Sequence, residues 1–376
     1  MKRSNSLRKS RNGGIYFYFG DHAIVIALVV FWVALFFTNS AFSSFSNYSA
    51  IIKEASIFAV AGIGMTFAVI SGVFDLSIAS QIALSSVVFT AILPRITPEI
   101  PGLGIVLSCV VIIIMGVAMG LINGLLVANL RIPAFITTLA MQMVYRGLAQ
   151  FVNNSPVPIS SLGNEYRSFT ATAMEDVVRW QVGGVELFFG RGFGGTRLFG
   201  FPLFFYIMIA LALIGTVILR KTGIGRNILA IGNSREAAHI AGINVPRTQI
   251  ITFVMVGLFT AFAGIMMTSH HGSSNYGVPS GTEFTVISAV VLGGTALAGG
   301  KGSILNTVIA ALFIATISTA LTGFGIDNNI HGIFNGAILV FAFSINTIRS
   351  YADDAFVKFL ANRDIKAIAN KTAATK

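Results

Sequence analysis

Polar side chains at helical spacing mark residues 132–152, an otherwise apolar stretch, as a place where a hydrophilic solute could be handled. The polar residues are Thr137, Thr138, Gln142 and Arg146. Residues four apart share one face of a helix, so these side chains would form a stripe. Such a stripe would line a path for a polyhydroxylated solute. The alternative is hydrogen bonding between neighbouring helices, with Arg146 extending toward water.

A carboxylate and an amide stand in two other apolar stretches. Asp75, in SGVFDLS, comes directly before an apolar segment, so we interpret it as a helix N-cap; the alternative is a proton or ion site. Asn123 stands in a segment whose glycines recur at four-residue spacing. Those glycines are Gly116, Gly120 and Gly124. This spacing is typical of close helix packing, and Asn123 is expected on that packing face.

No catalytic constellation is visible in the sequence. The stretch GTALAGGKGS resembles a phosphate-binding loop, but the pattern needs Gly at Thr295 and Ser or Thr at Gly302. His270 and His271 have no Cys or carboxylate neighbours in sequence, so no metal site is expected there. The single cysteine, Cys109, is interpreted as a packing residue. We therefore expect neither an enzyme nor a cofactor bound by this chain.

The composition indicates a chain that needs lipid. Hydrophobic residues make up 55% of it and charged residues only 10%, against roughly a quarter in soluble domains. So few charges cannot cover a water-exposed surface of this size. We predict an all-α, polytopic membrane protein. Its net charge of +11 is concentrated in the tails and one central loop, which is typical of cytoplasmic segments and not of a nucleic-acid surface.

Ten segments meet or approach the roughly 20 apolar residues that a membrane-crossing helix needs. They are residues 22–38, 51–71, 77–93, 103–128, 132–152, 201–219, 250–269, 284–298, 305–322 and 331–348. The third and eighth are short, and glycines interrupt the eighth. Irregular backbone inside a membrane is tolerated only where protein or water covers it, so a broken helix beside the solute path is expected there.

Basic residues predict how these segments are oriented. The tail 1–21, the loop 220–247 and the tail 349–376 are rich in Lys and Arg, so both termini and the loop are expected in the cytoplasm. The membrane domain would span 22–348, and the last tail would lie on an anionic leaflet as an interfacial helix. The insertion 153–200 has mixed strand and turn signals and is expected to form a small lobe outside.

Two weaker signals concern the arrangement of the segments. Lys53 and Glu54 stand where the second segment begins and are expected as an interfacial pair. The stretch Ala68–Ser86 resembles Thr285–Ser303. This match would fit a parallel duplication of the kind found in transporters, and the alternative is chance similarity of composition.

The polar, basic stretch Thr222–Val245 separates two long apolar segments and is either a passive connector or a docking surface. Its sequence, TGIGRNILAIGNSREAAHIAGINV, includes small residues at 237, 238 and 241 within a short amphipathic helix. These would fit closely into a groove of a cytoplasmic partner, and Arg226 and Arg235 would face an acidic rim. We therefore predict docking.

The same stretch resembles the cytoplasmic coupling segment of bacterial ABC-transporter permeases of the monosaccharide class, which import ribose, galactose, xylose or arabinose. Four further stretches resemble this family in the same order. They are SGVFDLSIASQIALSS, LRIPAFITTLAMQMVYRGLA, FGFPLFF and FTVISAVVLGGTALAGGKGSILNTVIAAL. Five motifs in order make the resemblance specific over roughly residues 51–348.

The resemblance implies one transmembrane subunit of an importer in the inner membrane. Two permease chains would form the pathway, two ATPase subunits that use ATP and Mg²⁺ would dock on the cytoplasmic side, and an extracytoplasmic binding protein would deliver the sugar. The coupling helix would be Ser234–Gly242. Residues expected in the ATPase coupling are Arg226, Gly232, Arg235, Glu236, Ala237, Ala238 and Gly242. Alternatives left open are a nucleoside or other sugar-like solute, or an ion-coupled secondary transporter.

Overall fold

Long helices dominate the part of the chain that the computed structural model describes. The described residues are 26, 28–37, 45–96, 100–163, 166, 177–182, 185–190, 197–198, 201–274, 276–278, 281–326, 332–334, 336–341 and 343–344. The long helices are α2 (Phe45–Ile70), α3 (Ile78–Ile92), α4 (Pro101–Ala128), α5 (Ala134–Val152), α6 (Leu203–Lys221), α9 (Val245–His271) and α11 (Ile304–Gly323). The predicted tails 1–21 and 349–376 lie outside the described residues.

Short elements connect these helices. Three short α-helices are α7 (Gly223–Asn233), α8 (Arg235–Ile240) and α10 (Thr282–Leu292), and the 3-10 turns are η3 (Leu93–Arg95) and η4 (Ile159–Ser161). Three antiparallel strand pairs are β1 (Val157–Pro158) with β6 (Ser273–Ser274), β2 (Val177–Val182) with β3 (Val185–Gly190), and β4 (Arg197–Leu198) with β5 (Phe201–Pro202). The β2–β3 hairpin confirms the strand signals read in the insertion 153–200.

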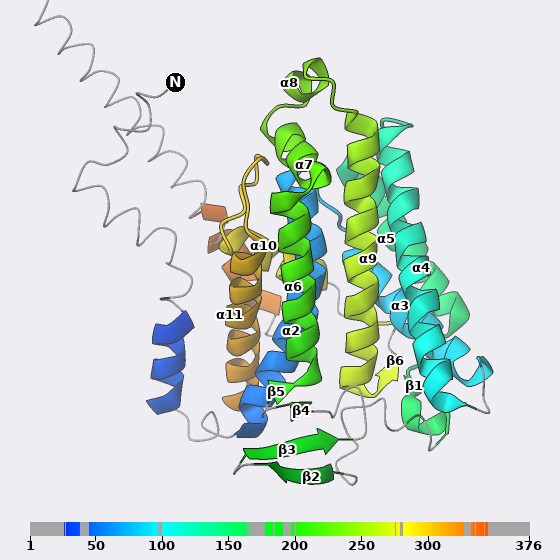
Figure 1. The fold of residues 1–376 in the computed structure, drawn as a ribbon, viewed down its shortest axis with the longest axis vertical. Helices are drawn as coiled ribbons and strands as arrows, with labels where there is room; N and C mark the ends of the chain where they lie inside the picture. The colour runs from blue at the N-terminus through cyan, green and yellow to red at the C-terminus, as the bar shows by residue number, and fades with distance from the viewer. Residues whose placement is uncertain are drawn as a thin grey trace, which may run out of the picture.

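The long helices lie side by side, with α7 and α8 at one end of the bundle and the β2–β3 hairpin at the other (Figure 1). We call these the α8 end and the lobe end. Six helices are long and apolar enough to cross a membrane by length and composition. They are α2, α3 with η3, α4, α6, α9 and α11. This result supports a polytopic membrane protein, as the composition predicted.

The helices differ in how much of their surface the chain itself covers. About seven-tenths of the spans in α2 and α3 are buried inside the described structure, against 28% in α4 and 33% in α6. Three of the largest fully buried side chains belong to α2 and α9: Phe67, Phe253 and Phe259. The centre of the bundle is therefore α2, α3 and α9, and α4 and α6 present apolar side chains outward.

Glycines let α4 approach α9 closely. A Cβ atom at Gly120 would collide with the backbone of Phe253, and one at Gly257 would collide with the carbonyl of Gly116. Gly124 meets the backbone of Ile250 in the same way. The four-residue glycine spacing thus forms the close packing face that the sequence predicted.

Replacing Gly120 by valine is expected to destabilise the fold by about 2 kcal/mol, because two backbones would have to separate. The measurement is thermal unfolding in detergent. Gly147→Ala in α5 is the control, since a Cβ there meets no atom within 4 Å. Equal unfolding temperatures for both variants would contradict the close α4–α9 contact.

Two non-helical breaks, one between α2 and α3 and one between α10 and α11, begin with the same local backbone conformation. After α2, Val73 N donates to Ala68 O at 3.1 Å, and Gly72 adopts φ +79°. After α10, Thr295 N donates to Val290 O at 3.2 Å, and Gly294 adopts φ +83°. Only glycine takes this conformation without strain, so both helices end in the same glycine cap. The same cap also ends α8, at Gly242, and α11, at Gly325, so it does not test the sequence echo, which stays a prediction.

Three helix boundaries differ from the prediction. α2 begins at Phe45, so Lys53 and Glu54 lie about two turns inside it and not at its start. The helix extends through a polar stretch because each added residue gains one backbone hydrogen bond. Glu54 Oε1 accepts a hydrogen bond from Ser318 Oγ of α11 at 3.3 Å. At the other two boundaries, α9 begins before residue 250 and α10 ends before residue 298.

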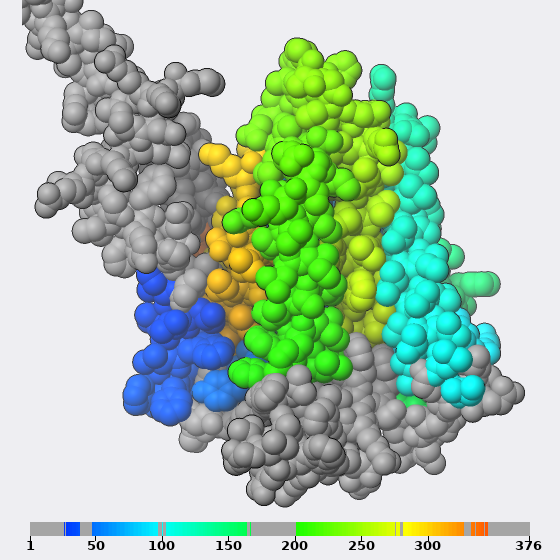
Figure 2. All heavy atoms as spheres, in the orientation of Figure 1, coloured from blue at the N-terminus to red at the C-terminus, as the bar shows by residue number. Residues whose placement is uncertain are grey.

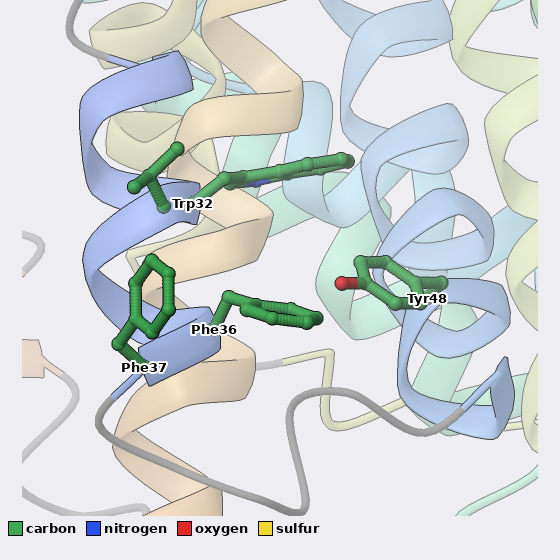
Figure 3. Close-up of a pocket in the computed structure, with 5 residues that line it drawn as sticks. Trp32, Phe36, Phe37 and Tyr48 are labelled. Atoms are coloured by element: carbon green, nitrogen blue, oxygen red, sulfur yellow. The ribbon is translucent and has the colours of Figure 1, made fainter.

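Aromatic packing holds the short helix Leu28–Phe37 against α2 and α11. Trp32 and Phe36 project from it toward Tyr48 of α2, and together they line a small pocket (Figure 3). The rings of Trp32 and Tyr48 are 5.7 Å apart, and Trp32 Nε1 donates to Thr316 Oγ1 of α11 at 2.8 Å. This helix falls within the first predicted segment.

Candidate functional site

The segment α7–α8 is a pair of capped helices at one end of the bundle, where α7 packs on the long helices and α8 projects from them. Thr222 caps α7 by accepting from Gly225 N at 3.2 Å, and Ser234 caps α8 by accepting from Ala237 N at 3.2 Å. Gly242, with φ +81°, follows the end of α8. Figures 1 and 2 show α8 beyond the ends of α6 and α9, with α7 between α6 and α8. Local sequence therefore fixes both helices before any partner binds.

The outer face of this projection combines charge with one large apolar side chain. Arg226 on α7 and Arg235, Glu236 and Ala237 on α8 are exposed. Ile240, which the sequence analysis did not single out, is 79% exposed. Its position four residues after Glu236 places both on one helix face, and that spacing could have identified it.

Two of the predicted coupling residues face the protein itself. Ala238 is only 4% exposed and packs toward its own chain. Gly232 is packed so tightly that a Cβ there would collide with Ile70 O and with Gly300 N. These two residues therefore attach the projection to the bundle, and the residues available to a partner lie on the opposite face.

A backbone junction joins α7 to both breaks of the bundle. Gly300 N, in the loop between α10 and α11, donates to Ile70 O at the end of α2 at 2.8 Å. Gly232 lies against both groups, and Asn233 fills the space beside Gly300. Close-packed backbones transmit displacement because they have no soft side chains between them. Movement of α7 would therefore act directly on α2 and on the α10–α11 loop.

Asp75 is fully buried at the α2–α3 break and is held by four hydrogen bonds. Its Oδ1 accepts from Ser77 N at 2.8 Å and from Ser77 Oγ at 2.5 Å. Its Oδ2 accepts from Gln81 Nε2 at 3.2 Å and from Asn123 Nδ2 at 3.1 Å. The carboxylate thereby ties the break to α3 and α4.

The predicted N-cap role of Asp75 is wrong in position. Ser77 occupies the N-cap of α3, and Asp75 bonds to Ser77 in a turn that precedes the helix. The network reaches further than a cap would, since Tyr145 OH of α5 lies 3.0 Å from both Asn123 Oδ1 and Met119 O and donates to one of them. Asn123 of α4 thus bridges the break to α5.

The polar stripe of α5 divides between two surroundings. Thr137 and Thr138 are buried, and Thr138 Oγ1 bonds to Phe135 O of its own helix at 3.4 Å. Gln142 Nε2 donates to Glu283 Oε1 of α10 at 3.3 Å. Glu283 had no signal in the sequence beyond its charge in an apolar region.

Arg146 secures the chain that leads into α10. Its Nη1 donates to Tyr276 O at 3.1 Å and to Val278 O at 2.8 Å. Gln142 and Arg146 therefore make bonds between segments, which was one of the two interpretations of the stripe. A role in lining a solute path stays a prediction. Within the described ranges, no group of three His, Cys, Asp or Glu residues is placed to hold a metal ion.

Comparison with known proteins gives consistent matches over most of the chain. A family model described as "Branched-chain amino acid transport system / permease component" matches residues 47–343. The L-arabinose transport system permease protein AraH of Escherichia coli K12 is 35% identical over 327 residues, 85% of this chain and 87% of AraH. The ribose import permease protein RbsC of the same strain is 31% identical over 319 residues, 85% of this chain and 91% of RbsC. Its galactose/methyl galactoside import permease protein MglC is 29% identical over 359 residues, 93% of this chain and 98% of MglC. No solved structure matches.

Proposed function

Because this chain belongs to the permease family that contains these sugar ABC importer subunits, we propose that it forms the translocation pathway for a monosaccharide. An extracytoplasmic binding protein would deliver the sugar, and separate ATPase subunits would drive import by docking on α8. The observation that carries the proposal is the projection α7–α8. It presents a charged, partly apolar face outward and is joined internally to both helix breaks.

We place the α8 end in the cytoplasm of a multi-pass inner-membrane protein. Basic residues gather at that end of the described structure. They include Arg131, Arg220, Lys221, Arg226, Arg235, Arg247 and Lys301. Six described helices have the length and composition to cross a membrane, and the ten crossings that the sequence predicts would put both termini on the cytoplasmic side. The β2–β3 hairpin would then face the binding protein.

The docking face of α8 would bind the ATPase through the apolar side chain of Ile240 and the charged residues beside it. An exposed Ile on a six-residue helix has no partner surface within the described part of its own chain. Apolar anchors of this kind fill a pocket of the partner and carry much of the binding energy, while surrounding polar groups set orientation. Glu236, in the first turn of α8, is also stabilised by the helix dipole. Nucleotide-driven closure of the ATPase subunits would then move α8 as a rigid body.

The outward apolar surfaces leave room for a second permease chain. On α5, Phe135, Met143 and Phe151 are between 61% and 88% exposed, opposite the side that packs on α3. Lipid or a second copy would cover this face, and we assign part of it to the copy. The pathway would then run beside α5.

Charge reversal on α8 tests the docking proposal. The pair Arg235→Glu with Glu236→Arg, and separately Ile240→Ser, should weaken ATPase association roughly thirtyfold, the equivalent of about 2 kcal/mol. Uptake should fall in parallel, while thermal unfolding stays unchanged because all three side chains are exposed. The measurements are copurification of the ATPase and ATP-dependent uptake of L-arabinose, D-ribose and D-galactose.

The control for this experiment is Arg95→Glu, an exposed charge at the lobe end. It should change neither ATPase association nor the rate of uptake at saturating binding protein. If the α8 variants behave like this control, the docking surface lies elsewhere and the proposal fails.

A further inference from the structure

Helix α10 begins inside the apolar depth of the bundle and not at its edge. It has 11 residues, about 16 Å at 1.5 Å per residue, which is about half the thickness of a bilayer's hydrocarbon core. The described residues between α9 and α10 (272–274, 276–278 and 281) are non-helical. Figure 1 places β6 near the lobe end and α10 farther toward α8. Non-helical backbone at such depth is covered by protein or lines water, and interrupted helices of this kind mark solute sites in transporters.

Three planar polar side chains belong to this start or bond to it or to the segment before it. Gln142 and Arg146 lie one turn apart on α5, and Glu283 lies in the first turn of α10. The Glu283 side chain is 95% buried, since its exposed fraction is 5%. Its carboxylate accepts two long hydrogen bonds, each 3.3 Å, from Gln142 Nε2 and from Gly281 N. Within the described residues, no Lys or Arg side chain forms an ion pair with the Glu283 carboxylate. Its two long hydrogen bonds therefore stabilise this buried group only weakly.

Some N–H groups of Arg146, near the start of α10, make no hydrogen bond within the described structure. Both of its hydrogen bonds within the described structure use Nη1, which reaches Tyr276 O and Val278 O. A guanidinium has five N–H donors, so the remaining groups are available to another acceptor. The cluster thus offers carboxylate acceptors, an amide with both functions and free cationic donors.

On one side of the cluster, neighbouring side chains are not covered by the described part of the chain itself. Met143, next to Gln142, is 78% exposed, and Phe284, next to Glu283, is 44% exposed. A Cβ built at Gly281, or at Gly147 on α5, meets no atom within 4 Å. A pathway that runs along this side would bring a solute to the polar groups.

We propose that Gln142, Arg146 and Glu283 form a hydrogen-bonding site for adjacent hydroxyl groups of a sugar inside the pathway. This inference rests on the proposed function and adds the residues that contact the solute. Two neighbouring hydroxyls donate to the carboxylate oxygens in place of its long bonds, and the amide and guanidinium bond to the sugar oxygens. Few contacts are involved, so the sugar is held weakly enough to leave, as passage requires.

Thiol labelling tests the site directly, because the chain has a single cysteine. The background variant is the full chain with Cys109→Ser in nanodiscs, to which Phe284→Cys is added. A charged, water-soluble methanethiosulfonate reagent is expected to modify the new thiol. L-arabinose, D-ribose or D-galactose should slow labelling at least fivefold. Adding Glu283→Gln should raise the half-protecting sugar concentration about tenfold, because a charge-assisted hydrogen bond is lost.

The matched control is Val217→Cys in the same background, on the outward apolar face of α6 with 55% exposure. It should resist the reagent and show no sugar effect. Two further controls are Glu54→Gln, which changes another carboxylate, and thermal unfolding of every variant. Glu54→Gln should leave the half-protecting concentration unchanged.

The inference is overturned if Phe284→Cys is as unreactive as Val217→Cys, if no sugar protects it, or if Glu283→Gln leaves protection unaltered. Sugar uptake by the wild-type chain with its ATPase distinguishes failure of this sugar site from failure of the proposed import function. If uptake occurs but no sugar protects the Phe284→Cys thiol from labelling, the sugar site is wrong and the proposed function is unaffected. Absence of ATP-dependent uptake removes the proposed function itself.

Discussion

Replacement of Gly232 by valine is expected to reduce ATP-dependent sugar uptake at least tenfold and to destabilise the fold by about 3 kcal/mol. The reason is steric. A side chain at this position would occupy the space of Ile70 O and Gly300 N, which are hydrogen-bonded to each other at 2.8 Å. Valine would therefore push α7 away from both breaks and disrupt the close backbone packing between α7 and the α10–α11 loop.

The matched control is Gly223→Ala, at the first residue of the same helix. The nearest atom to a Cβ there is Arg226 Nη2 at 3.9 Å, so no backbone has to move. Uptake and unfolding temperature should match the wild type. Full uptake by Gly232→Val, with the variant correctly inserted, would show that force does not reach the bundle through this junction.

Asp75→Leu is expected to cost about 4 kcal/mol, because it leaves buried donors of Ser77, Gln81 and Asn123 without their acceptor. Thermal unfolding in detergent measures this loss. Asp75→Asn should cost only about 1 to 2 kcal/mol. Its remaining oxygen still serves Ser77, and the Gln81 and Asn123 amides can each turn over to present an oxygen to the new NH₂ group.

The order of these two variants is the informative result. If a hydrogen-bond network fixes the α2–α3 break, Asp75→Asn should destabilise the fold less than Asp75→Leu. If both variants abolish uptake but unfold at the wild-type temperature, Asp75 acts in transport chemistry and not in holding the break. That outcome would favour the proton or ion site left open by the sequence.

Features that depend on residues near each other in sequence were predictable. The apolar segments predicted the long helices, the four-residue glycine spacing of α4 predicted its close packing, and strand and turn signals predicted strands in the insertion that forms the β2–β3 hairpin. The family resemblance implied a short helix at Ser234–Gly242, and in the structure Ser234 caps the start of α8 and Gly242 follows its end.

Features that depend on distant pairings were not predictable. Nothing near Gly232 in sequence indicates that its neighbours are Ile70 and Gly300. Asp75 was correctly identified as polar and costly, but its partner Asn123 is 48 residues away. Glu283 is 141 residues from Gln142, so single-sequence patterns could not join them. The sites that matter most here lie where such long-range contacts meet.

The most direct measurement of the central claim is sugar accumulation in proteoliposomes that contain this chain with or without the ATPase subunit that copurifies with it. With ATPase, ATP and binding protein present, we predict accumulation of L-arabinose, D-ribose or D-galactose. Without the ATPase, we predict none, whatever proton or sodium gradient is applied. Accumulation driven by an ion gradient in vesicles that hold this chain alone would contradict the account.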